Sequence, residues 1–174
     1  MFSRMRLSTK LVAAFALLIV LQVGGNVVSL AVLGNIDNSV DDLSTNWLPS
    51  VEAISDVAQN LQTLRRQELL HILSTDEAAM RNYESRYAEA KTNLAQDVAR
   101  YEKLISSSEE RTIFNSFSAD LTKYYAISTR LLDMSRKNQN EEAKALTEGE
   151  SRAVFTAIMT DLDKLIAINT KGAA

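Results

Sequence analysis

Arginine is the residue type in this chain that best suits the binding of a small anion. A guanidinium group presents a planar fork of donors that can hold a carboxylate through two hydrogen bonds, which a lysine ammonium cannot do. Arg65 and Arg66 are adjacent in the sequence, and Arg65 lies four residues after Leu61 and four before Leu69. In a helix Arg65 therefore falls on or beside an apolar stripe, where an unpaired charge would be costly. Arg66 is rotated by about 100° from it and is a candidate to face a partner subunit.

Three tyrosines have a spacing that places them on the inner faces of helices: Tyr83, Tyr87 and Tyr124. Each ring is apolar and carries a hydroxyl that needs a partner when it is buried. Together with Arg65 and Arg130 they could wall a small pocket within one subunit, but ordinary core packing explains each ring taken alone. His71, the single histidine, is predicted to cap a helix or to lie on the surface rather than to bind a ligand.

The composition excludes several classes of protein. The chain has no cysteine and one histidine, so it has no disulfide framework, zinc-finger ligand set or thiol nucleophile. It also lacks a glycine-rich phosphate loop, metal-ligand spacing and a nucleophile elbow. Beyond the first ten residues the chain holds 22 acidic and 16 basic residues, and this acidic balance disfavours nucleic-acid binding. We therefore expect a protein that is not an enzyme and that has no catalytic residue, metal or cofactor.

The charge is distributed unevenly along the chain. Arg4, Arg6 and Lys10 lie in the first ten residues, no charge follows until Asp37, and every acidic residue lies at or beyond that position. Residues 11–33 are mostly apolar, and about 20 such residues cross a bilayer. This pattern predicts a cytoplasmic segment at residues 1–10, a transmembrane helix at residues 11–33 and an outer domain at residues 35–171. A cleaved signal peptide is the alternative, and it also places the outer domain outside the cytoplasm.

The outer domain is predicted to be all-α. Proline and glycine are scarce, and three segments place a capping side chain three residues before a glutamate, beginning at Ser74, Ser107 and Asn138. Apolar residues follow heptads between these caps. The expected helices span residues 36–73, 75–105, 108–137 and 139–170, and Pro49 should kink or interrupt the first near Trp47. Short turns between long helices predict an antiparallel up-down-up-down four-helix bundle.

This topology would gather most arginines of the outer domain at one end of the bundle, far from the membrane. The arginines in that half are Arg65, Arg66, Arg81, Arg86, Arg130, Arg136 and Arg152. Their concentration suits a carboxylate ligand. The alternative is that they pair with the acids of the same end on solvated helix faces, where such pairs contribute little to stability.

Several stretches of the sequence resemble the extracytoplasmic four-helix-bundle sensor domain of bacterial methyl-accepting chemotaxis proteins, together with its first transmembrane helix. They are Asn46-Trp47-Leu48-Pro49-Ser50-Val51, the run from Leu61 to Arg65-Arg66-Gln67-Glu68-Leu69, and the closing Leu165-Ile166-Ala167-Ile168-Asn169. The resemblance implies a homodimer in the bacterial inner membrane. It also implies a periplasmic sensor domain that binds a small attractant near the membrane-distal tip and controls a cytoplasmic kinase. In the aspartate and serine receptors of this family, spaced arginines on the first helix and a threonine on the fourth hold the ligand. Arg65 and Arg66 lie in the comparable stretch of the first helix, and Thr156 is the match on the fourth. The sequence departs from the family pattern because its two arginines are adjacent rather than spaced.

From the resemblance and the residues together, the expected ligand-binding set is Arg65, Arg66, Tyr83, Tyr87, Tyr124, Arg130, Arg152 and Thr156. The expected ligand is a small organic acid or an amino acid, held within one subunit or at the dimer interface. Two alternatives remain: a sensor domain of a histidine kinase or a cyclic-dinucleotide enzyme, and a structural or adaptor bundle.

Overall fold

The computed structural model describes residues 8, 11–12, 15–26, 29, 40 and 43–172. The chain divides into two units, Met1–Leu43 and Ser44–Ala174, and the second unit holds the bundle. Among the described residues, no helix combines the length and the apolar character that a membrane crossing requires. The predicted span at residues 11–33 lies partly outside those residues, and the segment at 1–10 lies outside them except for Ser8.

The first long helix of the bundle follows a π-helical turn. The turn, η2, covers Leu43–Trp47, and α2 covers Leu48–Leu73. Pro49 lies in the first turn of α2, where the missing backbone N–H of proline is tolerated because no intrahelical acceptor is available there. The interruption expected near Trp47 is therefore a change from π to α geometry.

The capping motifs were predicted correctly at one of three positions. Ser107 and Glu110 form a reciprocal capping box before α4, which covers Ser108–Arg136. The cap of α3, which covers Glu77–Glu102, is Asp76 rather than Ser74, and its carboxylate accepts from Ala78 and Ala79. Asn138 does not cap the next helix: it takes a positive φ of 54° just after α4, a conformation that asparagine adopts more readily than most residues.

The fourth helix runs from Asn140 to Gly172 and contains a π-helical turn. Where the sequence predicted one helix over residues 139–170, the structure has α5 at Asn140–Leu146, a π-helical turn η3 at Thr147–Ser151, and α6 at Arg152–Gly172. The backbone N–H of Arg152 bonds to Thr147 O, which is the i→i+5 pattern of a π-turn.

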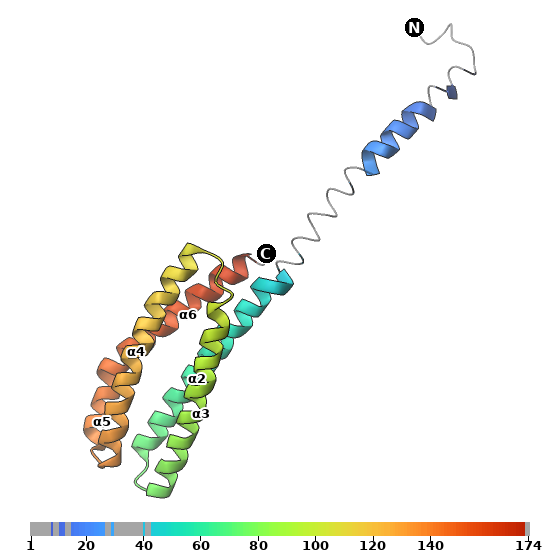
Figure 1. The fold of residues 1–174 in the computed structure, drawn as a ribbon. Coiled ribbons are helices and arrows are strands. Elements are labelled where there is room, and N and C mark those ends of the chain that lie inside the picture. Colours follow the sequence, from blue (N-terminus) through green and yellow to red (C-terminus); the bar gives the residue numbers. More distant parts are fainter. Residues whose placement is uncertain are drawn as a thin grey trace. The chain divides into compact units, whose positions relative to one another are not determined.

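The helices pack as two hairpins, α2 with α3 and α4 with α5 and α6 (Figure 1). The turn after α2 and the turn after α4 lie at one end of the bundle, here named the Ser74 end, and the α3–α4 turn lies at the opposite end, the Ser107 end (Figure 1). Fully buried apolar side chains run along the middle, among them Leu61, Leu94, Tyr124 and Leu165. A smaller cluster of Ile72, Leu131, Leu132 and Ala143 fills the Ser74 end. The all-α prediction is confirmed for the described residues.

Candidate ligand-binding site

A groove of about 600 Å³ lies near the Ser74 end, between the last turns of α2 and the fourth helix. From α2 it is lined by Arg65, Leu69, Ile72 and Leu73. The other wall consists of Asn140, Glu141, Lys144, Thr147, Glu148 and Arg152. We call it the α2–α5 groove. Leu69, Ile72 and Leu73 supply its apolar surface, and the other lining residues are polar or charged.

Arg65 is the cation of this groove with the most contacts, and these contacts hold its guanidinium on several sides. Nη2 donates to Thr147 O at 2.9 Å, and Nη1 donates to Ser151 Oγ. Nη1 also lies 3.8 Å from Glu68 Oε2, and the guanidinium carbon lies 5.6 Å from the centre of the Phe155 ring. A guanidinium has five N–H donors, so these contacts orient the group and leave donors for an anion.

Glu68 lies beneath Arg65 and is completely buried. It accepts hydrogen bonds from Tyr124 at 2.7 Å and from Ser128. Burial raises the pKa of the Glu68 carboxyl, although the bonds from Ser128 and Tyr124 and the charge of Arg65 act in the opposite direction. Burial likewise raises the pKa of the Tyr124 hydroxyl. Glu68, which is itself held by Tyr124 and Ser128, therefore helps to orient the Arg65 guanidinium from the core side.

The open part of the groove carries charges of both signs. Lys144 and Arg152 are exposed cations on its wall, and Glu141 and Glu148 are exposed acids on the same wall. With Arg65 the cations exceed the acids by one. Such a lining can hold a carboxylate, and it also offers acceptors to a ligand that carries an ammonium group. Within the described part of the chain, no group of three or more metal-ligating side chains is present.

Two of the residues expected from the sequence meet in this groove, Arg65 and Arg152. Tyr124 lies inside the bundle on Glu68, and Tyr87 is half-buried against the core beside Ser128. Tyr83 is half-buried on α3. None of the three rings lines the groove.

The other expected residues lie elsewhere. Arg130 is on the surface of α4 and pairs with Glu150 at 3.0 Å. Thr156 is exposed on α6, outside the groove lining. Arg66 lines a separate polar groove of about 470 Å³ between α2 and α3, together with Arg86 and the buried Gln67.

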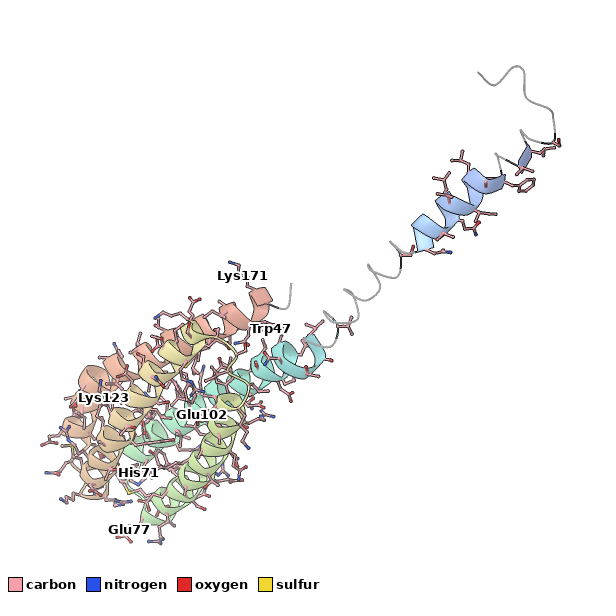
Figure 2. All side chains as sticks on the ribbon, turned by 45° about the horizontal axis from the view of Figure 1, so that its top comes forward. Trp47, His71, Glu77, Glu102, Lys123 and Lys171 are labelled. Carbon is pink, nitrogen blue, oxygen red and sulfur yellow. The ribbon has the colours of Figure 1, made fainter. Side chains whose placement is uncertain are left out.

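The prediction for His71 is wrong: it is neither a cap nor a surface residue. Its side chain is fully buried, and in Figure 2 it lies among the helices near the Ser74 end, which Glu77 marks. Nδ1 lies 2.8 Å from Ser135 Oγ, and Nε2 lies 3.0 Å from Glu84 Oε1. Arg136 donates to the same carboxylate oxygen at 2.7 Å. Burial opposes ionisation of Glu84, but the bonds from Arg136 and His71 lower its pKa overall.

Sequence reasoning missed Glu68, Thr147 and Ser151. One signal was available for Glu68: it lies three residues after Arg65 and seven after Leu61, so it shares the apolar stripe. A second was Ser128, a polar residue at a heptad position of α4. No local signal distinguishes Thr147 or Ser151, because their contact with Arg65 joins residues more than 80 positions apart.

Comparison with known proteins identifies the family. Residues 4–174 match the family described as the four helix bundle sensory module for signal transduction. The chain belongs to this family. A relative in Bacillus subtilis (strain 168), YvaQ, is named as a candidate sensory transducer protein and is 23% identical over 145 residues. That match covers 82% of this chain and 25% of the relative, so the chain spans about a quarter of that protein's length.

Membership confirms the resemblance to the sensor domain of chemotaxis receptors. It also confirms that the chain is not an enzyme, because the family consists of signalling modules of transducer proteins. For a sensory module, the α2–α5 groove is the candidate ligand site with the most strongly oriented cation.

Proposed function

We propose that the chain is the ligand-binding module of a bacterial chemoreceptor and that it binds a small carboxylate in the α2–α5 groove. The orientation of Arg65 carries the proposal: a guanidinium fixed by Thr147 and Ser151 faces a groove large enough for a small organic acid or amino acid. A donor fork held in place before binding gains affinity because less side-chain freedom is lost when the anion arrives.

The wider setting of this function rests on the family and on the charge pattern of the sequence. Chemoreceptor sensors are attached to a membrane, and residues 11–33 supply a mostly apolar segment whose described side chains are exposed. We place the bundle in the periplasm, as a homodimer whose output is a cytoplasmic kinase. The basic residues that precede the apolar segment support this orientation.

The first experiment is a melting-shift screen with organic acids and amino acids, followed by calorimetry with the compound that gives the largest shift. Arg65→Ala should weaken binding at least tenfold, or by about 1.4 kcal/mol. Because Arg65 also contacts η3 and Glu68, Arg152→Ala provides a second test, since this exposed cation lines the groove without a structural bond among the described residues.

Arg81→Ala is the matched control. It removes an arginine from the same end of the bundle, but Arg81 is exposed, pairs with Glu77 and lies outside the groove. Its affinity should equal that of the wild type. A screen in which no carboxylate shifts the melting temperature would contradict the proposal and favour an adaptor bundle. Equal losses in all three variants would contradict the assignment to this groove.

A further inference from the structure

The wall of the α2–α5 groove opposite α2 is built differently from the rest of the bundle. It consists mainly of α5 and η3, residues 140–151, which we call the flap. Ala143 is the buried residue of α5, and Thr147 and Ser151 are those of η3. In contrast, α6 buries Ile158, Leu162 and Leu165 almost completely. Because buried apolar surface is the main stabilising contribution, the flap is the part of the fourth helix that opens most easily.

Both ends of the flap are marked by irregular backbone. Just before it, Asn138 takes the left-handed conformation, and the Gln139 cap makes no side-chain hydrogen bond to α5. At the other end, η3 holds one residue more than an α-helical turn would. These two points can change conformation without altering the buried faces of α4 and α6.

The flap also carries two polar atoms that have no partner within the described part of the protein. Asn140 Oδ1 and Thr147 Oγ1 are buried and have no hydrogen-bond partner within residues 43–172. Both residues line the groove. Each is a polar group beside the groove whose hydrogen bond a water molecule or a ligand can supply.

Arg65 is the partly buried side chain that opposes this opening, and the exposed pair of Arg130 and Glu150 also joins the flap to α4. Its guanidinium donates to Thr147 O and Ser151 Oγ, which are the first and last residues of η3. Arg65 is in turn held by the buried Glu68 of its own helix. One side chain of α2 therefore spans the whole π-turn.

We propose that the flap opens and closes the α2–α5 groove by movement at Asn138 and η3, and that Arg65 holds it closed. This inference rests on the proposed function, because it states that one wall of the proposed binding groove controls access to that groove. A carboxylate bound at Arg65 would contact the same guanidinium group that bonds to both ends of the π-turn. Binding of a ligand in the groove is therefore coupled to the geometry of η3. This turn directly precedes α6 in the chain.

Hydrogen exchange of the ligand-free 174-residue chain, kept in detergent and read by mass spectrometry, tests the flap without any ligand. Amides of the flap should exchange at least about tenfold faster than those of residues 153–168. Arg65→Met should accelerate the flap about tenfold further, and Ser151→Ala, which removes one contact, should accelerate it about threefold. Residues 77–102 of α3 should be unchanged in both variants and serve as the internal reference.

Deletion of Gly149 tests the π-turn itself. Gly149 is exposed and a Cβ added to it would meet no atom within 4 Å. Because the π-turn holds one residue more than an α-helical turn, removal of Gly149 should let η3 close as an α-helical turn and slow flap exchange toward the rate of α6. Gly149→Ala keeps the chain length and should leave the flap faster than α6. If the deletion prevents folding, Ser151→Ala still decides the test.

Two results would overturn the proposal: a flap that exchanges as slowly as α6, or variants that accelerate the flap and α3 equally. Failure to find a carboxylate ligand would instead contradict the proposed function and leave the exchange result intact.

Discussion

The bundle contains two fully buried glutamates, one near each end, and their surroundings differ. Glu68, near the Ser74 end, accepts from two hydroxyls and lies 3.8 Å from Arg65. Glu110, at the Ser107 end, accepts from the backbone N–H groups and hydroxyls of Ser106 and Ser107. It also accepts from Tyr101 and Asn169, both at 3.0 Å.

The difference reverses the direction of the pKa shift. Burial raises the pKa of Glu68, and its donors do not offset that effect. Burial also acts on Glu110, but the bonds from Asn169, Ser106, Tyr101 and Ser107 lower its pKa overall. The depth of burial and the number of donors to a carboxylate therefore decide together whether its ionised form is favoured. At the Ser107 end the ionised form of Glu110 is favoured. At the Ser74 end, beside the candidate site, the ionised form of Glu68 is disfavoured.

Replacing each glutamate by glutamine should give the largest contrast. Glu110→Gln leaves several buried donors without an acceptor and should lower the free energy of unfolding by about 3 kcal/mol. Glu68→Gln removes a poorly compensated charge, so its loss should be below about 1 kcal/mol. Denaturant unfolding of both variants measures the two values. Equal losses would show that the two carboxylates are equally well stabilised.

The dependence of stability on pH should separate the same two residues. The pKa of Glu68 is raised above its usual 4.5, so its contribution is present below that pH and is lost as the pH rises through the folded-state pKa. The pKa of Glu110 is lowered below 4.5, so its contribution is present above that pH and is lost as the pH falls through the folded-state pKa.

Unfolding free energies of the wild type and of the two glutamine variants, measured across both sides of pH 4.5, give each contribution by difference. The difference for Glu68→Gln should shrink with rising pH, and that for Glu110→Gln should shrink with falling pH. Differences that change in the same direction would remove the distinction between the two ends.

Removing one hydroxyl from each network should give the smallest contrast between the two ends. Tyr124→Phe deletes one of the two hydroxyl donors of Glu68 and should cost about 1.5 kcal/mol. Tyr101→Phe deletes one of several donors of Glu110 and should cost about 1 kcal/mol or less. Thermal unfolding is a suitable measurement, with Tyr125→Phe as a control at a half-buried ring outside both networks. A larger loss for Tyr101→Phe would contradict the ranking.

Local sequence patterns predicted the all-α fold. They did not predict features that depend on contacts between residues far apart in the sequence. The capping box at Ser107 is complete in the sequence, and α2 ends at Leu73, where the prediction ended it. At the next turn Ser74 and Asp76 are both suitable caps, so local preference does not choose between them. The π-turn has no sequence signature, because it is held by Arg65 from the other hairpin.

The candidate site shows the same division. Arg65 was identified from its place beside an apolar stripe, and Arg152 from its depth along the bundle. Glu68 was missed because its donors come from α4, 56 and 60 residues away. The burial of His71 depends on Ser135, 64 residues away. Heptad spacing predicts which face of its own helix a residue lies on. It does not predict which polar side chain of a neighbouring helix that residue will contact.

The bonds of Asn169 have a consequence for engineered fusions. Its amide nitrogen is buried and contacts Tyr101, Glu110 and Leu165 O near the end of α6. The rotational phase of the helix is therefore fixed at that residue. A reporter helix joined after Lys171 would inherit this phase, so linkers that differ by single residues would turn it by about 100° each. Hybrid receptors built at this junction should alternate between active and silent with the period of an α-helix.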